Sequence, residues 1–146
     1  MSEKTILLIE DNPDDEELAL LAFQQSRIAN KVVVCRDGQE ALDYIFDSDE
    51  KTQKTLNLPQ LILLDLKLPK VSGLEVLRRI RGDERTALLP VVMLTSSREE
   101  EDIVKSYKLG ASSYIRKPVD FARFVEAIQQ VQMYWLVLNE SPLGAN

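Results

Sequence analysis

The 146-residue sequence contains no histidine, and this absence removes several kinds of chemistry. Without an imidazole, the chain cannot form a Ser-His triad, an imidazole metal site or a phosphohistidine of its own. Its one cysteine, Cys35, cannot form an internal disulfide, and the apolar run before it predicts a small buried side chain. The five glycines include no GK[ST] motif, so a Walker-type phosphate loop is not expected.

The chain also lacks an excess of basic residues and a long apolar run. Its 18 Lys and Arg against 24 Asp and Glu give a net charge of -6, which argues against nucleic acid as a partner. No apolar stretch reaches about 18 residues, and Met1 is not followed by a signal-peptide pattern. We therefore expect no contact with nucleic acid, no membrane span and a cytoplasmic location.

Short segments rich in Val, Ile and Leu alternate with segments of helical periodicity, which predicts an α/β domain with a parallel sheet. The predicted strands are residues 5–9, 31–35, 61–64, 91–94 and 113–115. The first helix is expected over about 13–26, and the second begins with the capping-box pair Asp37 and Glu40. The third includes residues 74–80. The fourth ends near Leu109, before Gly110, and the fifth starts around Asp120. The polar segment 47–60 is expected at the surface.

Right-handed crossovers place the carboxyl ends of all parallel strands at one edge of the sheet, where open α/β folds bind ligands. The polar residues expected there are Glu10, Asp11, Asp65, Thr95, Ser96 and Lys117. Converging carboxylates repel one another unless a cation neutralises them, and an oxygen-only ligand set suits Mg²⁺. With Lys117 as a cation and Thr95 as a hydroxyl donor, the parts needed for phosphoryl transfer are present.

Each of these residues also has an ordinary structural explanation. Glu10 and Asp11 could interact only with the dipole of the helix that follows. Asp65 could be a turn residue, Lys117 a surface lysine and Thr95 a β-branched strand end. All of these residues are expected at one edge of the sheet, and a functional site explains this better than several independent structural roles do.

Four segments in order resemble the receiver domains of two-component response regulators: "LLIEDNPDD", "LILLDLKLPKVSG", "VVMLTSS" and "GASSYIRKP". The resemblance covers about residues 4–133 and is strongest to the small stand-alone phytochrome-associated response regulators of cyanobacteria. It implies a doubly wound, flavodoxin-like receiver fold with five parallel strands in the order 2-1-3-4-5 and five flanking helices. It also implies one domain over residues 1–146, with a C-terminal helix extension and tail and no output domain.

The resemblance further implies a role for each matching residue. Asp65 would accept a phosphoryl group from the phosphohistidine of a partner histidine kinase, expected to be a phytochrome. Mg²⁺ would be held by Glu10, Asp11, Asp65 and the main-chain carbonyl of Lys67. Thr95 and Tyr114 would form a switch pair, although a tyrosine at such a position, taken alone, is more often an ordinary half-buried strand aromatic than a switch. The peptide bond before Pro118 would be cis. Glu10 departs from the family pattern, in which Asp is common.

Two other classes of function stay open. A flavodoxin-like cofactor binder would need a phosphate-binding loop after the first strand, but "EDNPDD" would repel phosphate. A receiver-like interaction module that is never phosphorylated would share the fold and signal by binding alone.

The last predicted helix carries an apolar stripe at helical spacing: Phe121, Phe124, Ile128, Val131, Trp135 and Leu138. Further apolar residues, Met133, Tyr134, Leu136 and Val137, surround its end. A helix that is apolar all round is normally covered, so we expect a homodimer. Its interface would be this last helix together with the strand 113–115 and the helix that ends near Leu109. The alternative is that the tail folds back on its own domain.

Overall fold

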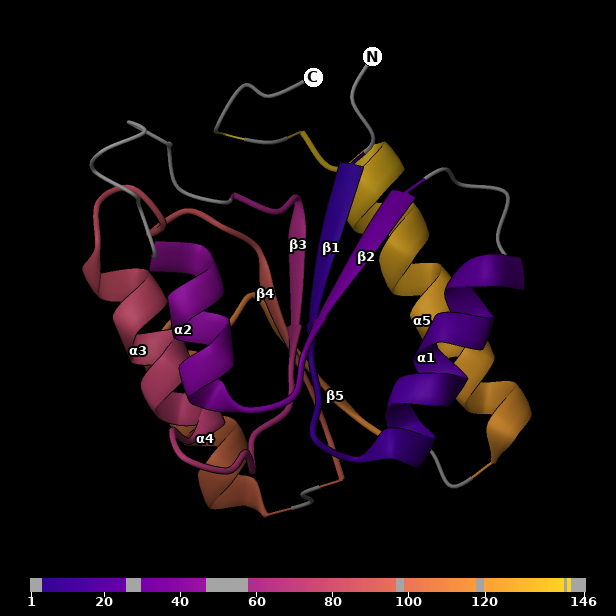
Figure 1. Ribbon diagram of the computed structural model, residues 1–146, viewed down its shortest axis with the longest axis horizontal. Helices are drawn as coiled ribbons and strands as arrows, with labels where there is room; N and C mark the ends of the chain where they lie inside the picture. The colour runs from indigo at the N-terminus through magenta and orange to yellow at the C-terminus, as the bar shows by residue number, and fades with distance from the viewer. Residues whose placement is uncertain are drawn as a thin grey trace.

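The computed structural model describes residues 4–25, 30–46, 58–96, 99–117, 120–140 and 142. Five parallel strands form one sheet in the order β2-β1-β3-β4-β5, and their carboxyl ends share one edge (Figure 1). The strands are β1 (Lys4–Ile9), β2 (Asn30–Cys35), β3 (Leu61–Leu64), β4 (Val91–Thr95) and β5 (Ser113–Arg116). The predicted fold class and strand order are confirmed, and each strand matches its predicted range to within one residue at either end.

Helices cover both faces of this sheet, as parallel sheets require. They are α1 (Pro13–Gln25), α2 (Gly38–Phe46), α3 (Gly73–Gly82), α4 (Glu100–Lys108), α5 (Phe121–Met133) and a π-helical turn, η1 (Tyr134–Leu138). In Figure 1, α2, α3 and α4 lie on one side of the sheet and α1 and α5 on the other. Side chains alternate along each strand, so β1 sends Leu7 and Ile9 to one core and Ile6 and Leu8 to the other.

Polar side chains fix the helix ends that border the functional edge. Asn12 Oδ1 accepts from the N–H groups of Asp14 (2.9 Å) and Asp15 (3.1 Å) at the start of α1. Asp37 Oδ1 accepts from the Glu40 N–H at 2.7 Å, as the capping box predicted. In a capping box, the Glu40 carboxylate would accept from the N–H of Asp37. Here it accepts instead from the N–H of Arg36, one residue earlier, at 3.1 Å. These caps set where the first turns of α1 and α2 begin.

The other helix ends follow the sequence signals. Asp120 caps α5 by accepting from the Ala122 N–H at 2.8 Å. Gly110, with a φ of 100°, ends α4 in the left-handed conformation that glycine adopts without strain. The predicted stop at Gly110 is confirmed.

The end of the last helix differs from the predicted stripe. Leu138 is 65% exposed, whereas Leu136 is buried. The prediction assumed 3.6 residues per turn, but the π-helical turn adds a residue and rotates the chain beyond Val131. Lys4, from the far end of the sequence, donates to the Leu136 carbonyl in this turn. The side chain of Phe121 lies outside the described part of the structure.

Within the described residues, none of the helices combines the length and apolar character needed to cross a membrane.

Candidate functional site

Backbone pairing continues one residue beyond three strands and places three of the predicted side chains. The Glu10 N–H donates to the Cys35 carbonyl at 3.0 Å, and the Asp65 N–H donates to the Ile9 carbonyl at 3.0 Å. The Lys117 N–H donates to the Thr95 carbonyl at 2.8 Å. Because these bonds extend the sheet, the side chains of Glu10, Asp65 and Lys117 have fixed starting points at its carboxyl edge.

Three carboxylates meet at this edge. One oxygen each from Glu10, Asp11 and Asp65 lies within 4.8 Å of the other two. Glu10 is 2% exposed and Asp65 is 8% exposed, whereas Asp11 faces solvent. An oxygen-only cluster that is open to solvent on one side fits a hard divalent cation that keeps several waters.

Lys117 lies among the acids rather than at the surface. Its Nζ is 2.6 Å from Glu10 Oε1, 2.8 Å from Asp15 Oδ2 and 3.3 Å from Asp65 Oδ2, and its side chain is 8% exposed. The predicted pairing of Lys117 with Asp65 is present. Asp15 was not among the predicted site residues, so its contact with Lys117 was missed. The signal available was its position, in the first turn of a helix that starts at this edge.

Burial shifts the pKa values of both paired groups. Desolvation raises the pKa of Glu10 to about 8; the hydrogen bond from Lys117 opposes this rise, and the nearby Asp65 charge adds to it. Desolvation works to lower the pKa of Lys117, but hydrogen bonds to Asp15 and Glu10 outweigh it, so the pKa is raised. Lys117 is therefore fully charged at neutral pH, and Glu10 can hold a proton there when no cation is bound.

The other predicted residues occupy different parts of the same edge. Thr95 ends β4 and is 1% exposed, Ser96 follows it at the surface, and Tyr114 is half-buried on the neighbouring strand. Lys67 is exposed in the loop after Asp65. The cis bond predicted before Pro118 lies outside the described residues.

The loop after β3 depends on two glycines. A Cβ at Gly73 would overlap the carbonyl oxygen of Asp65, and one at Gly38 would overlap the carbonyl oxygen of Val71. Within this loop, Lys70 has a φ of 67°, in the left-handed region, and the Val71 N–H donates to the Pro69 carbonyl at 2.8 Å. The "PKVSG" segment is thus a tight turn that packs directly against the backbone of Asp65.

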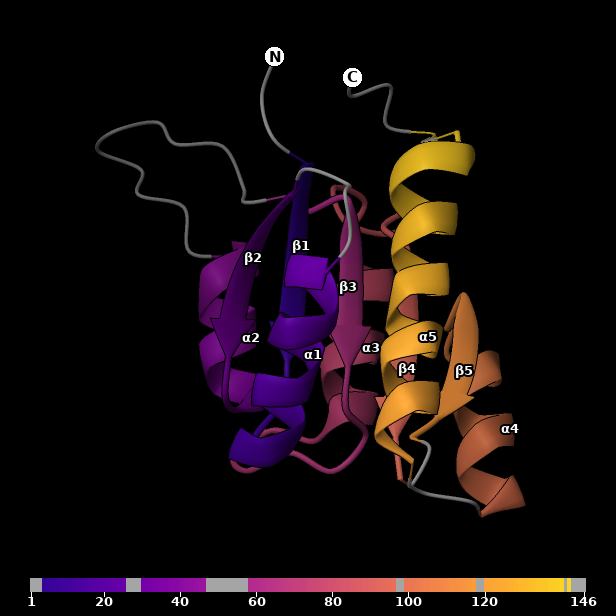
Figure 2. The same ribbon diagram turned by 90° about the vertical axis from the view of Figure 1, so that its right-hand side faces the viewer.

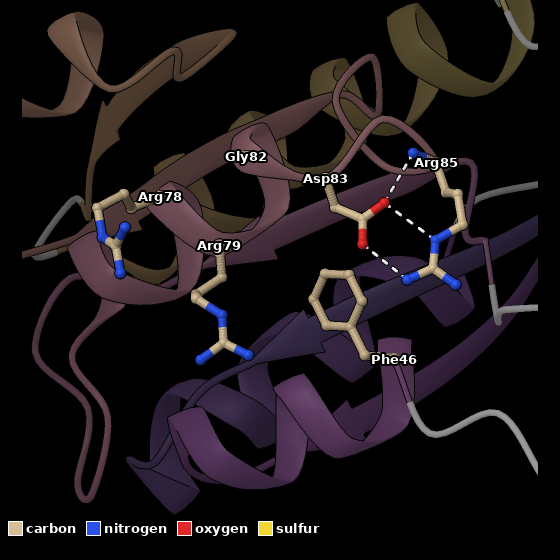
Figure 3. A pocket seen from close by; sticks show the side chains of 6 residues that line it. All are labelled: Phe46, Arg78, Arg79, Gly82, Asp83 and Arg85. Atoms are coloured by element: carbon tan, nitrogen blue, oxygen red, sulfur yellow. Dashed lines mark hydrogen bonds and ion pairs between the residues drawn. The ribbon is translucent and has the colours of Figure 1, made fainter.

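A pocket between α2 and α3 has a different chemistry (Figure 3). Its volume is about 390 Å³, and it is lined by Phe46, Arg78, Arg79, Gly82, Asp83 and Arg85. Arg85 pairs with Asp83 at 2.7 Å. Three guanidinium groups against one carboxylate make this pocket positive, so it does not suit a metal cation.

Comparison with known proteins identifies the family of this chain and several similar structures. The family described as "Response regulator receiver domain" matches residues 6–129. Response regulator Rcp1 of Synechocystis sp. is 35% identical over 133 residues, which cover 91% of this chain and 89% of Rcp1. The Mn²⁺-bound structure of Rcp1 superposes with a TM-score of 0.85 over 95% of this chain and 99% of that chain, at 34% identity.

Two further solved structures are similar over nearly the whole chain. The phosphorylated cyanobacterial phytochrome response regulator RcpA has a TM-score of 0.87 and 37% identity, covering 97% of this chain and 99% of its own. The bacteriophytochrome response regulator RtBRR is 50% identical, with a TM-score of 0.74, and the match covers 98% of this chain and 86% of its own. With the 2-1-3-4-5 sheet and the acidic edge already in place, these matches show that the chain belongs to the response regulator receiver domain family.

Proposed function

We propose that Asp65 accepts a phosphoryl group from the phosphohistidine of a partner histidine kinase, in a reaction that depends on Mg²⁺. One observation carries this proposal: Asp65 lies within 4.8 Å of two further carboxylates and within 3.3 Å of a buried lysine ammonium. The cluster of carboxylates suits a divalent cation, and the lysine ammonium can neutralise the negative charge of a phosphoryl group on Asp65.

The proposed step exchanges one bond to phosphorus for another. A carboxylate oxygen of Asp65 forms the new O–P bond while the P–N bond to the donor imidazole breaks. The bonding electron pair stays on the imidazole nitrogen, which takes up a proton. Lys117 would then donate to an oxygen of the phosphoryl group, and the hydroxyl of Thr95, the last residue of the adjacent strand β4, would donate to another.

Glu10, Asp11 and Asp65 are the side chains that would hold the cation, with the Lys67 carbonyl as a proposed fourth protein ligand. When bound, Mg²⁺ would neutralise the charge that develops on the phosphoryl oxygens. Glu10 would lose its proton to make room for the ion, which is consistent with the raised pKa of this buried carboxyl.

Thr95 and Tyr114 are the proposed switch pair. By the alternation of side chains along β4 and β5, both belong to the face of the sheet covered by α2, α3 and α4, and Tyr114 packs against that core. A Thr95 side chain drawn toward a phosphoryl group would leave space that the tyrosine ring can enter. The surface around α4, β5 and α5 would then change its shape and its binding.

A phytochrome-type kinase is the proposed donor, because the named relatives RcpA and RtBRR are response regulators of phytochromes. Phosphotransfer between such partners would take place in the cytoplasm.

The test is phosphotransfer from candidate kinases to the wild type and to Asp65→Asn, followed by intact-mass measurement. We expect a gain of one phosphoryl group in the wild type, dependent on Mg²⁺ and absent from Asp65→Asn. Transfer that survives the substitution would assign the acceptor to another residue.

The competing proposal is an interaction module that binds partners without phosphorylation. It predicts no gain in mass with Mg²⁺ and a small phosphodonor, and no effect of Asp65→Asn on binding. The burial of Asp65 and Lys117 disfavours it, because a binding surface alone gives no reason to bury a charged network.

We also propose a homodimer through the α4-β5-α5 side and η1. Exposed apolar side chains gather there: Val104, Tyr107, Met133, Tyr134, Val137 and Leu138. An apolar groove of about 430 Å³ runs between β5 and the end of α5, lined in part by Ile115, Val131 and Trp135. Figure 2 shows α5 beside β5, with the end of the helix continuing beyond the strand. In a two-fold dimer, a second copy of the chain would bring its own exposed apolar side chains against this groove.

Analytical ultracentrifugation tests the dimer. At tens of micromolar we expect a dimer for the wild type and a monomer for Val137→Glu, whose side chain is 52% exposed. Leu88→Glu, at a 60% exposed apolar side chain in the turn before β4, should remain a dimer. A monomeric wild type, with or without phosphorylation, would remove this proposal.

A further inference from the structure

The ammonium of Lys117 has three N–H donors and three carboxylate partners. The two shorter contacts go to Glu10 and Asp15, at 2.6 and 2.8 Å, and the longest goes to Asp65, at 3.3 Å. In the unphosphorylated protein, the donors of Lys117 are therefore fully used, and Asp65 receives the weakest of the three interactions.

Asp15 is held in place for this contact. Asn12 caps α1 and accepts from the N–H of Asp15 itself, which fixes the backbone of the first turn. Its neighbours in that turn face elsewhere: Asp14 is exposed, and Glu16 pairs with Arg36 at 2.9 Å. Among the acidic side chains described in this turn, only that of Asp15 contacts Lys117. Because the helix dipole favours every acid in the turn, the dipole alone does not explain this particular contact.

We propose that Asp15 is a positioning residue for Lys117, which holds the ammonium toward α1 and occupies an N–H donor that a phosphoryl group on Asp65 would otherwise use. The consequence for phosphorylation rests on the proposed role of Asp65. A phosphoryl group brings additional negative charge to Asp65, so Lys117 must shift toward it and release another acceptor. Asp15 is the acceptor most easily released, because its side chain is 27% exposed and water can replace the ammonium, whereas Glu10 is buried.

Asp15 thereby slows phosphorylation in two ways. It competes for the ammonium, and its own negative charge repels the incoming phosphoryl group. Asp15→Asn keeps the size and the capped backbone but removes the charge. Asp14→Asn is the matched control, because it removes a charge from the same helix turn, has the same Asn12 cap and does not contact Lys117.

The first measurement follows the Nζ resonance of Lys117 by NMR in ¹⁵N-lysine-labelled, metal-free protein, assigned from its loss in Lys117→Met. We expect this resonance to shift in Asp15→Asn and to stay in place in Asp14→Asn. An unchanged resonance in Asp15→Asn would overturn the proposal. This readout needs no phosphorylation, so it decides the Asp15 contact even if Asp65 proves not to be an acceptor.

The second measurement is the rate of phosphorylation by a small phosphodonor at saturating Mg²⁺. We expect Asp15→Asn to react roughly threefold to tenfold faster than the wild type, the range expected for one partly exposed charged hydrogen bond. Asp14→Asn should stay within about twofold, as expected for an exposed charge without a partner at the site. A shifted resonance with an unchanged rate would overturn the claim that Asp15 restrains the reaction.

Discussion

At the scale of single residues, the buried charges of Glu10 and Lys117 are the costly feature of this protein. Removing an ion from water costs free energy. A partner of opposite charge offsets this cost only when the other hydrogen-bonding positions of the buried ion are also satisfied. Lys117 meets this condition through three carboxylates. Glu10 pairs with Lys117 through one oxygen and accepts from the Asn12 N–H at 3.2 Å through the other, yet desolvation still raises its pKa to about 8.

The raised pKa of Glu10 predicts how stability depends on pH in the metal-free protein. Between its unfolded pKa of 4.5 and its folded pKa of about 8, the folded chain keeps a proton that the unfolded chain has lost. The contribution of the protonated Glu10 carboxyl to the free energy of unfolding is thus complete below pH 4.5 and is lost as the pH rises to about 8. We expect this loss to lower the free energy of unfolding by roughly 3 to 5 kcal/mol.

Urea denaturation in the presence of a chelator, repeated across this pH range, measures the effect. Glu10→Gln is the control, because its amide cannot titrate and its curve should lack this slope. Equal slopes for the wild type and Glu10→Gln would contradict the assignment.

The same proton predicts the pH dependence of metal binding. A cation must displace it, so Mg²⁺ should bind more weakly at pH 6 than at pH 8.5 and release close to one proton per ion at pH 6. Calorimetry in two buffers of different ionisation enthalpy gives this proton count directly. A count near zero at pH 6 would mean that Glu10 is already ionised.

Gly73 predicts a steric effect beside the acceptor. A Cβ there would overlap the Asp65 carbonyl oxygen, so we expect Gly73→Ala to lower the free energy of unfolding by about 2 to 4 kcal/mol. Gly82 ends the same helix with nothing within 4 Å of an added Cβ, so Gly82→Ala should be neutral or stabilising by up to about 1 kcal/mol. Thermal or urea denaturation compares the two; similar losses would contradict this account.

At the scale of elements, the sequence predicts most where local patterns and long-range contacts agree. The strand 61–64 is apolar throughout and is buried on both faces, so its pattern identifies it without help from its neighbours. The π-helical turn at 134–138 could not be predicted in the same way. It includes a contact between Lys4 and the Leu136 carbonyl, which are 132 residues apart in sequence, and local patterns do not indicate such a contact.

The rotated end of the last helix gives an element-scale prediction. Leu136→Ala should lower the free energy of unfolding by about 2 to 4 kcal/mol, because a buried leucine leaves a cavity. Leu138→Ala should change it by less than about 0.5 kcal/mol, because that side chain is 65% exposed. Urea denaturation of dilute protein, below the concentration at which a dimer forms, compares the two. A larger loss for Leu138→Ala would mean that the helix keeps its ordinary spacing.

At the scale of the whole molecule, topology gathers the site. Glu10, Asp65 and Lys117 are far apart in sequence, and parallel pairing brings them to one edge. The right-handed crossover rule made this edge predictable, and the structure brings Glu10, Asp11 and Asp65 together as expected. The contact of Asp15 with Lys117 was not predictable, because it depends on where Asn12 starts α1 and how far the lysine side chain reaches inward.

The central claim is that this edge seats a divalent cation beside an aspartate that takes up a phosphoryl group. Borohydride reduction converts an acyl phosphate to an alcohol, and peptide mass spectrometry then locates the modified residue. After reaction with a small phosphodonor and Mg²⁺, we predict homoserine at position 65 and no conversion in a sample kept in chelator. Conversion at another aspartate, or at position 65 without a divalent cation, would contradict the account.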